Sequence, residues 1–95
     1  MDINEYHHEF YSSCPANGEV IRYDLAISTR KVIKVEHIVT RCAMHKNAYH
    51  EAIADDLATA FPGHQVLRAY HHGVYIRTTR AGNDAGCPTK YEDLQ

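Results

Sequence analysis

A cysteine in a tight polar turn is the residue of this sequence best suited to nucleophilic chemistry. Cys14 opens the run Cys-Pro-Ala-Asn-Gly that ends at Gly18. Proline and glycine on either side of the Ala-Asn pair favour a turn that presents backbone amides near the thiol. Such donors favour the thiolate, which is the nucleophilic form of cysteine. The residues alone leave open the alternative that Cys14 only fills a small pocket, as Cys42 is expected to do on a buried helix face.

The tripeptide Tyr49-His50-Glu51 is the second candidate for chemistry. In the functional interpretation, Glu51 faces a pocket and accepts hydrogen bonds from an amide or amidine edge of a heterocycle. His50 is then a proton donor that works near neutral pH. A carboxylate in the first turn of a helix is also stabilised by the helix dipole, so Glu51 has a purely structural explanation as well.

The spacing of cysteine and histidine does not predict a metal site. The cysteines Cys14, Cys42 and Cys87 are odd in number and include no Cys-x-x-Cys pair, so all three are expected to be reduced thiols. Four of the eight histidines form the doublets His7-His8 and His71-His72. Neighbouring residues of a strand point to opposite faces of a sheet, so a doublet there seldom binds one ion. We therefore expect no bound metal.

Length and composition indicate one domain that spans residues 1–95. The chain is 44% hydrophobic and 23% charged, as in ordinary soluble proteins, and its small core makes a homo-oligomer expected. The net charge of −2, without long runs of like charge, disfavours a surface that tracks nucleic acid. No stretch approaches the roughly 20 apolar residues of a membrane span. The first residues lack the features of a signal peptide, so a cytoplasmic location is expected.

In the first half of the chain, the spacing of apolar residues changes from that of a strand to that of a helix. Val20–Thr29 alternates between apolar and polar side chains, as a half-buried strand does. A shorter strand is predicted at Val32–Val35. A helix face then follows, formed by Val35, Ile38, Val39, Cys42 and Ala43. A strand through residues 33–39 is the competing interpretation, because short apolar runs are ambiguous.

The second half is predicted to hold a helix and a hairpin. The helix runs from Ala48 to Phe61, and Pro62-Gly63 ends it. Gln65–Tyr70 and Val74–Thr79 read as two strands linked by a turn at residues 71–73. From Ala81 onward the chain is predicted to be a loop.

The expected order is strand, strand, helix, helix, strand, strand. It predicts an α+β fold in which four antiparallel strands form one sheet and both helices lie on one face of it. The open edges of such a sheet would invite pairing between subunits.

The cysteine turn and the later tripeptide also carry a family resemblance. The run Phe10-Tyr-Ser-Ser-Cys-Pro-Ala-Asn-Gly18 resembles the Phe-Thr-Ser-x-Cys-Pro-x-x-Gly signature of the 7-cyano-7-deazaguanine (preQ0) reductases of the tunnelling-fold superfamily. Tyr49-His50-Glu51 with Asp55-Asp56-Leu57 is similar to that family's Phe-His-Glu stretch and following helix. Pro88-Thr-Lys-Tyr-Glu92 is similar to its Gly-Thr-Lys-Tyr-Glu end. The resemblance covers nearly the whole chain and implies a tunnelling fold (T-fold) in rings of subunits with interfacial sites.

The resemblance implies a specific reaction. Cys14 would attack the nitrile carbon of 7-cyano-7-deazaguanine to form a covalent thioimide. Glu51 would anchor the purine-like ring, Tyr49 would lie in the substrate site, and His50 would contact the substrate and supply a proton. A nitrile is a weak electrophile, so it needs both a positioned thiolate and an acid for the developing nitrogen anion.

One departure from the family pattern concerns the acid–base group beside the cysteine. The family follows its cysteine turn with Gln-Pro-Asp, where this chain has Glu19-Val20-Ile21. Ile21 therefore stands at the aspartate position. Glu19 is the expected catalytic substitute, because strand alternation puts Asp24 on the opposite face.

A second departure concerns NADPH. The family's Glu-Ser-Lys-Ser-x-Lys cofactor segment aligns with residues 32–37, where only Lys34 matches. Amine addition, as in the related amidinotransferase-like subfamily that makes the amidine of archaeosine, is therefore predicted ahead of NADPH-dependent nitrile reduction, and no cofactor is expected. The partner would be a free 7-deazaguanine, or tRNA or DNA if the base is already installed. The alternatives are a non-catalytic member that binds a purine or pterin, and a GTP cyclohydrolase-like zinc enzyme.

Overall fold

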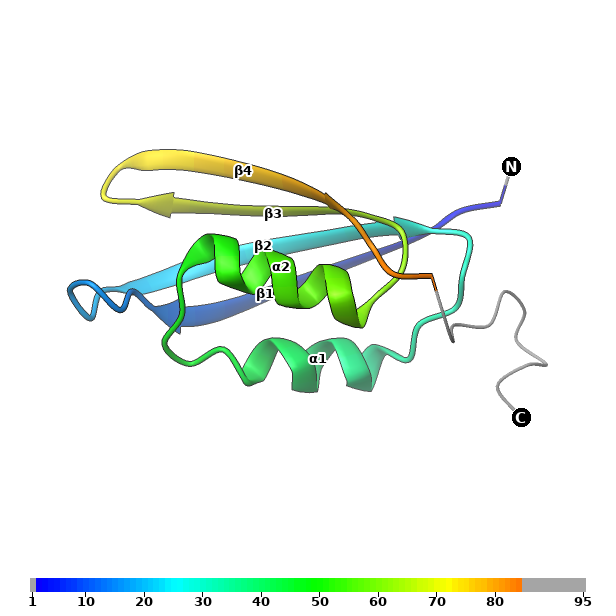
Figure 1. Cartoon of the computed structure of the whole chain (residues 1–95), viewed down its shortest axis with the longest axis horizontal. Helices are drawn as coiled ribbons and strands as arrows, with labels where there is room; N and C mark the ends of the chain where they lie inside the picture. The colour runs from blue at the N-terminus through cyan, green and yellow to red at the C-terminus, as the bar shows by residue number, and fades with distance from the viewer. Residues whose placement is uncertain (1, 85–95) are drawn as a thin grey trace.

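The chain forms a four-stranded antiparallel sheet with two helices packed on one face (Figure 1). The computed structural model describes residues 2–84. The elements in chain order are β1 (Asn4–Ser13), β2 (Val20–Thr29), α1 (Val35–Ala43), α2 (His50–Ala60), β3 (His64–His71) and β4 (Val74–Ala81). The strands lie in the order β1-β2-β3-β4, with α1 against β1 and α2 against β3 and β4. The predicted α+β class, the ββααββ order and the one-sided helices are confirmed.

The inner face of β2 is the centre of the core. Its side chains Ile21, Tyr23, Leu25 and Ile27 are each at most 2% exposed, as their alternation predicts. The register aligns Phe10 of β1, Tyr23 of β2, Ala69 of β3 and Ile76 of β4 in one row on the helix-facing side. One row of the sheet therefore continues from the cysteine-bearing hairpin to β4.

The strand predicted at Val32–Val35 is wrong. β2 is already paired with β1 on one side and β3 on the other, so this short segment cannot form a hairpin with the strand that precedes it. Val32 and Ile33 are buried instead in the loop before α1, where the Ile33 amide donates to the Tyr6 hydroxyl at 3.1 Å. The competing strand through residue 39 is also wrong, because Val35–Ala43 is helical.

β1 is the strand that the apolar pattern did not predict. Its inner positions alternate Tyr6, His8, Phe10 and Ser12 opposite the inner face of β2. Two of these four side chains are polar, so hydropathy hides the alternation. The extended backbone is set instead by the full ten-residue ladder with β2.

The predicted hairpin at residues 71–73 is confirmed. His71 pairs with Val74, which leaves His72 and Gly73 as a two-residue turn. Both have positive φ, 53° and 82°, as the tight turn of a twisted hairpin requires. Glycine adopts this conformation freely, and histidine adopts it at a small cost.

The two helices bury short apolar faces. α1 buries Ile38 and Cys42, so Cys42 fills the core as predicted. α2 lies within the predicted range of residues 48–61 and buries Ile53, Ala54 and Leu57. Tyr49 and Ala52 are exposed.

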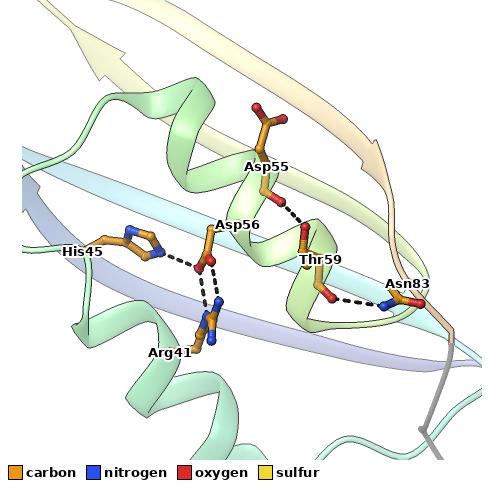
Figure 2. A network of polar contacts seen from close by, with 6 residues as sticks. All are labelled: Arg41, His45, Asp55, Asp56, Thr59 and Asn83. Atoms are coloured by element: carbon orange, nitrogen blue, oxygen red, sulfur yellow. Dashed lines mark hydrogen bonds and ion pairs between the residues drawn. The ribbon is translucent and has the colours of Figure 1, made fainter.

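An ion-pair network ties α1 to α2 (Figure 2). Asp56 of α2 accepts hydrogen bonds from two guanidinium nitrogens of Arg41, with Nε at 2.9 Å from Oδ2, and from His45 Nε2 at 2.7 Å. The hydrogen bonds from Arg41 lower the pKa of Asp56 below its ordinary value of 3.8, against the effect of burial, and His45 adds to the lowering. Beside this network, the Thr59 carbonyl accepts from Asn83 Nδ2 at 3.4 Å and so connects α2 to the segment after β4.

We expect Asp56→Asn to lower the free energy of unfolding by about 1 kcal/mol, because the charged acceptor shared by two donors is lost. For a chain of this size that is a fall in Tm of about 4–8 °C, measured by thermal circular dichroism. Asp55→Asn is the matched control, because the Asp55 carboxylate is 67% exposed and its pair with Arg80 is a surface salt bridge.

The same variant tests the pH dependence. A carboxyl whose folded pKa is lowered stabilises the protein above its unfolded pKa and loses this effect as the pH falls through the folded value. The difference between wild type and Asp56→Asn should therefore be fully present above about pH 5 and shrink in more acidic solution. Equal melting of the Asp55 and Asp56 variants at pH 7 would contradict the role of the network.

Candidate functional site

The Cys14 turn is closed by its own backbone. The Cys14 amide donates to the Glu19 carbonyl and the Gly18 amide donates to the Cys14 carbonyl, both at 2.7 Å. Gly18 has a φ of 75°, and the Asn17 side-chain oxygen accepts from the Glu19 amide at 3.0 Å. Cys14 is a free thiol, 9% exposed, that packs with the core. The predicted turn is therefore present, with its sulfur side chain directed inward.

Backbone hydrogen bonds hold the start of α2 close to this turn. The Ser13 amide donates to the Lys46 carbonyl at 2.9 Å, and the Ala48 amide donates to the Ser13 carbonyl at 3.2 Å. The segment before α2 thus continues the sheet beside the end of β1 for one isolated bridge, Ser13 with Asn47. Figure 1 shows the β1–β2 turn and the start of α2 at the same end of the molecule.

A cavity of about 300 Å³ opens at the start of α2. It is lined by Tyr49, His50, Glu51, His71 and Ile76. The three consecutive residues proposed from the sequence therefore share one cavity, and β3 and β4 supply the other two. Cys14 is not among its lining residues.

A larger hollow of about 740 Å³ lies at the opposite end of the sheet. Its walls include Thr29, Lys31 and Gly63, together with Asp2 and Asp84 at the two limits of the described chain. None of the residues proposed from the sequence to do chemistry lines it. The smaller cavity is therefore the candidate site.

Tyr23 contacts the two histidines that line the cavity. Its ring is fully buried and contacts the rings of His50 and His71, at centroid distances of 5.4 and 5.7 Å. Burial raises the pKa of Tyr23 to about 12, and the charge of the Cys14 thiolate contributes to the rise. The tyrosine ring therefore packs behind the two histidines that line the cavity, and Cys14 is close enough for its charge to act on the phenol.

Unsatisfied polar atoms gather at this end of the core. Within residues 2–84, five side-chain atoms are buried without a hydrogen bond of normal geometry: Ser12 Oγ, the Tyr23 hydroxyl and His50 Nε2 here, and Gln65 Oε1 and Arg68 Nε elsewhere on β3. Each such atom costs stability, of the order of 1–3 kcal/mol, unless a ligand or water satisfies it. The grouping of the first three around Cys14 and His50 is what a site for a polar ligand requires.

His50 and His71 form a hydrogen-bonded pair. His50 Nδ1 lies 3.2 Å from His71 Nε2. Burial lowers the pKa of His50, the charge of His71 adds to the lowering, and the Leu67 backbone and Glu51 oppose it. Burial also lowers the pKa of His71, with His72 adding to the effect and Glu19 opposing it. Both rings are therefore neutral at pH 7.

His71 was not predicted as a site residue. It was predicted to lie in the turn, but β3 continues through it. The alternation of Gln65, Leu67 and Ala69 on the inner face, extended by one step, would have placed His71 on that face as well.

Glu19 is held away from the thiol by the neighbouring hairpin. Its carboxylate, half-exposed, lies 3.4 Å from His72 Nδ1, while His72 Nε2 accepts from Asn17 Nδ2 at 2.9 Å. Only the Glu19 backbone reaches Cys14. His72 therefore fastens the β3–β4 turn to the β1–β2 turn.

Lys34 lies at the other end of the molecule. It is the residue before α1, five residues after the end of β2, whereas Cys14 precedes the start of β2. Figure 1 shows the start of α1 at the end of the molecule away from the β1–β2 turn. A ten-residue strand spans roughly 30 Å, so within one chain Lys34 and Cys14 do not belong to one site.

The structure bears on the predictions about metal binding, the C-terminal motif and membrane spans only within residues 2–84. No group of three histidine, cysteine, aspartate or glutamate side chains in residues 2–84 could hold a metal ion. Cys87 and the Pro88–Glu92 motif lie outside the described residues. In the same described range, no helix is long and apolar enough to cross a membrane.

Comparison with known proteins found no relative of this chain. Neither a family model, nor a curated protein, nor a solved structure matches the chain.

The histidine pair makes stability depend on pH. The unfolded chain binds protons at His50 and His71 near pH 6.5, whereas the folded chain binds them at lower pH. Stability should therefore fall as the pH drops below 6.5 toward the folded pKa values. We expect His50→Gln to reduce the fall in Tm between pH 7 and pH 5, measured by thermal circular dichroism.

The control is His64→Gln, which removes an exposed imidazole from the other face of β3 and should keep the fall caused by the pair. An identical pH profile in wild type and in His50→Gln would show that the pair does not set this dependence.

Proposed function

We propose that this chain is a tunnelling-fold enzyme that acts on the nitrile of 7-cyano-7-deazaguanine through Cys14, by adding an amine. The observation that carries the proposal is the convergence of Tyr49, His50 and Glu51 on one cavity, together with Tyr23, whose ring contacts His50 and whose pKa the charge of Cys14 raises. These are the residues that the motif resemblance assigns to the substrate and to the nucleophile.

The proposed reaction has two balanced steps. The Cys14 sulfur adds to the nitrile carbon, one carbon–nitrogen π bond opens, and the proton of the thiol passes to the nitrogen, which gives a thioimide. Ammonia or a primary amine then adds to the same carbon, the carbon–sulfur bond breaks, and the thiol recovers a proton from the incoming amine. The product is an amidine, and no electrons are gained or lost.

The cavity offers suitable contacts for a fused heterocycle. Its volume of about 300 Å³ lies at the lower end of the range for small-molecule sites. Glu51 is exposed in the first turn of α2, so its carboxylate is free to accept two hydrogen bonds from an amidine-like ring edge. The Tyr49 side chain, 58% exposed, provides an aromatic surface beside it.

Amine addition is preferred to NADPH-dependent reduction. Lys34 alone matches the reductase cofactor segment, and it lies a strand length away from Cys14. Both outer strands, β1 and β4, leave one edge unpaired within the described chain, which supports a homo-oligomer with sites completed between subunits. The free base is the proposed substrate, with tRNA or DNA as partner only if the base is already installed.

A non-catalytic purine- or pterin-binding protein is the second candidate. Ile21, at the position of the family's aspartate, is 2% exposed in the core and cannot transfer protons. The zinc-enzyme alternative has no set of three ligands in residues 2–84 to support it.

Intact-mass spectrometry with 7-cyano-7-deazaguanine tests the proposal. We expect a stable adduct heavier by one substrate molecule, because addition of a thiol to a nitrile loses no atoms. Cys14→Ala should abolish the adduct, and Glu51→Gln should weaken binding of the base. Ammonium should then release the amidine and restore the free mass.

Cys42→Ala and Cys87→Ala are the matched controls, since each removes a thiol to which the motif resemblance assigns no role. Adduct formation in both, but not in Cys14→Ala, assigns the nucleophile. Binding of the base without an adduct would favour the non-catalytic candidate, and absence of both would contradict the proposal.

A further inference from the structure

We propose that the sheet face away from the helices docks a second copy of this chain, face to face, about a twofold axis parallel to the strands. The contact uses a face of the sheet and leaves the edges of β1 and β4 free, so it is separate from edge pairing between subunits. It does not depend on the reaction proposed above.

The docking face is uncovered within residues 2–84. Both helices pack on the opposite face, where the candidate cavity also opens (Figure 1). Three tyrosines of the uncovered face are strongly exposed: Tyr11 at 58%, Tyr70 at 66% and Tyr75 at 49%. Tyrosine is enriched at protein–protein interfaces, because its ring supplies apolar contact area and its hydroxyl can still find a partner.

One row of this face is divided by charge. The register places four charged residues side by side across the strands: Glu9 of β1, Asp24 of β2, Arg68 of β3 and Arg77 of β4. Two carboxylates therefore occupy one half of the sheet, and two guanidinium groups occupy the other half.

The basic half of the row lacks a counter-charge. Arg68 and Arg77 lie directly opposite each other, and neither makes an ion pair or a hydrogen bond within residues 2–84. Arg68 Nε is buried without a hydrogen bond of normal geometry. Like charges directly opposite each other on a sheet repel. The two carboxylates, by contrast, share Arg22, whose Nε lies 2.8 Å from Glu9 and whose Nη2 lies 3.5 Å from Asp24.

A rotation of 180° about an axis parallel to the strands makes the row self-complementary. The axis lies between the two stacked sheets, so β1 of one copy lies over β4 of the other and β2 lies over β3. Glu9 then faces Arg77 of the second copy, and Asp24 faces its Arg68. A twofold axis perpendicular to the strands would instead place β1 over β1, with carboxylates against carboxylates. Charge complementarity therefore selects the first arrangement.

The aromatic side chains match under the same rotation. Tyr11 lies two residues from Glu9, and Tyr75 lies two residues from Arg77, on the same side of the charged row. Tyr11 therefore faces Tyr75 of the second copy. Within one chain, the rings of Tyr70 and Tyr75 already contact each other at a centroid distance of 5.3 Å. Docking would bury this aromatic pair beside the ion pairs.

The area of the face is sufficient for a dimer of modest affinity. Four strands about 4.8 Å apart, each about eight residues long at about 3.3 Å per residue, cover about 500 Å² of each copy. The total of about 1,000 Å² is at the lower end for specific interfaces. We therefore expect a dimer that forms at micromolar concentration and weakens as salt is added.

Two exposed charges on the outer strands test the arrangement, with sedimentation-velocity ultracentrifugation of the whole chain as the measurement. Glu9→Lys and Arg77→Glu should each raise the Kd of the dimer about tenfold or more, because each puts like charges together at two equivalent contacts. An equimolar mixture of the two variants should form a heterodimer of nearly wild-type affinity. In that mixture Lys at position 9 faces Glu at position 77, and the native Glu9 faces the native Arg77. Recovery in the mixture also excludes misfolding as the cause of the loss.

Glu36→Lys is the matched control, because it makes the same charge change in the first turn of α1, on the helix side of the sheet, and should leave the dimer unchanged. A wild type that stays monomeric at micromolar and higher concentrations would overturn the inference. An assembly that neither variant weakens, as edge pairing alone would give, would overturn it as well, and so would a mixture that does not recover. None of these results bears on adduct formation at Cys14, so the failure of this inference and that of the proposed function are distinguishable.

Discussion

Burial of the inner face of β2 is the constraint on which the rest of the structure depends. Four alternating side chains of this strand, from Ile21 to Ile27, are almost fully enclosed, and a shift of one residue would expose them all. Their burial fixes the pairing with β1 and β3 and the face on which both helices lie. It also brings Tyr23 into contact with the rings of Phe10, His50 and His71. The site is thus a consequence of the same alternation that forms the core.

The predictable part of the structure is the part whose residue types agree with their positions. β2, α2 and the turn before Val74 follow directly from alternation, helical spacing and turn residues. β1 was not predicted, because the polar residues His8 and Ser12 occupy positions on its inner face. Val32 and Ile33 were misread because an apolar run does not reveal that both edges of β2 are already paired. Sequence patterns report local preference, whereas pairing depends on which strands compete for an edge.

The candidate site likewise has residues whose positions the sequence predicts and residues whose positions it does not. Tyr49, His50 and Glu51 are consecutive, so their common location followed once α2 was recognised. His71 could not be linked to His50 without the β2–β3 register. Glu19 looked like a neighbour of Cys14 along the chain, but His72, on a distant turn, holds its carboxylate. Unpaired polar atoms at Ser12, Tyr23 and His50 keep this end of the core less stable than an apolar one, a common property of binding sites.

The division of the site among separate parts of the chain has a consequence for folding. The β1–β2 hairpin carries Cys14 and Tyr23, the β3–β4 hairpin carries His71 and Ile76, and α2 carries the remaining side chains. Each part forms from local contacts, but β2 and β3 pair only after the loop of residues 30–63, which contains both helices, has closed. An intermediate with both hairpins and both helices intact would therefore hold every reactive side chain and still have no cavity. Substrate would therefore bind only the chain in which β2 and β3 have paired, and its binding would stabilise that pairing.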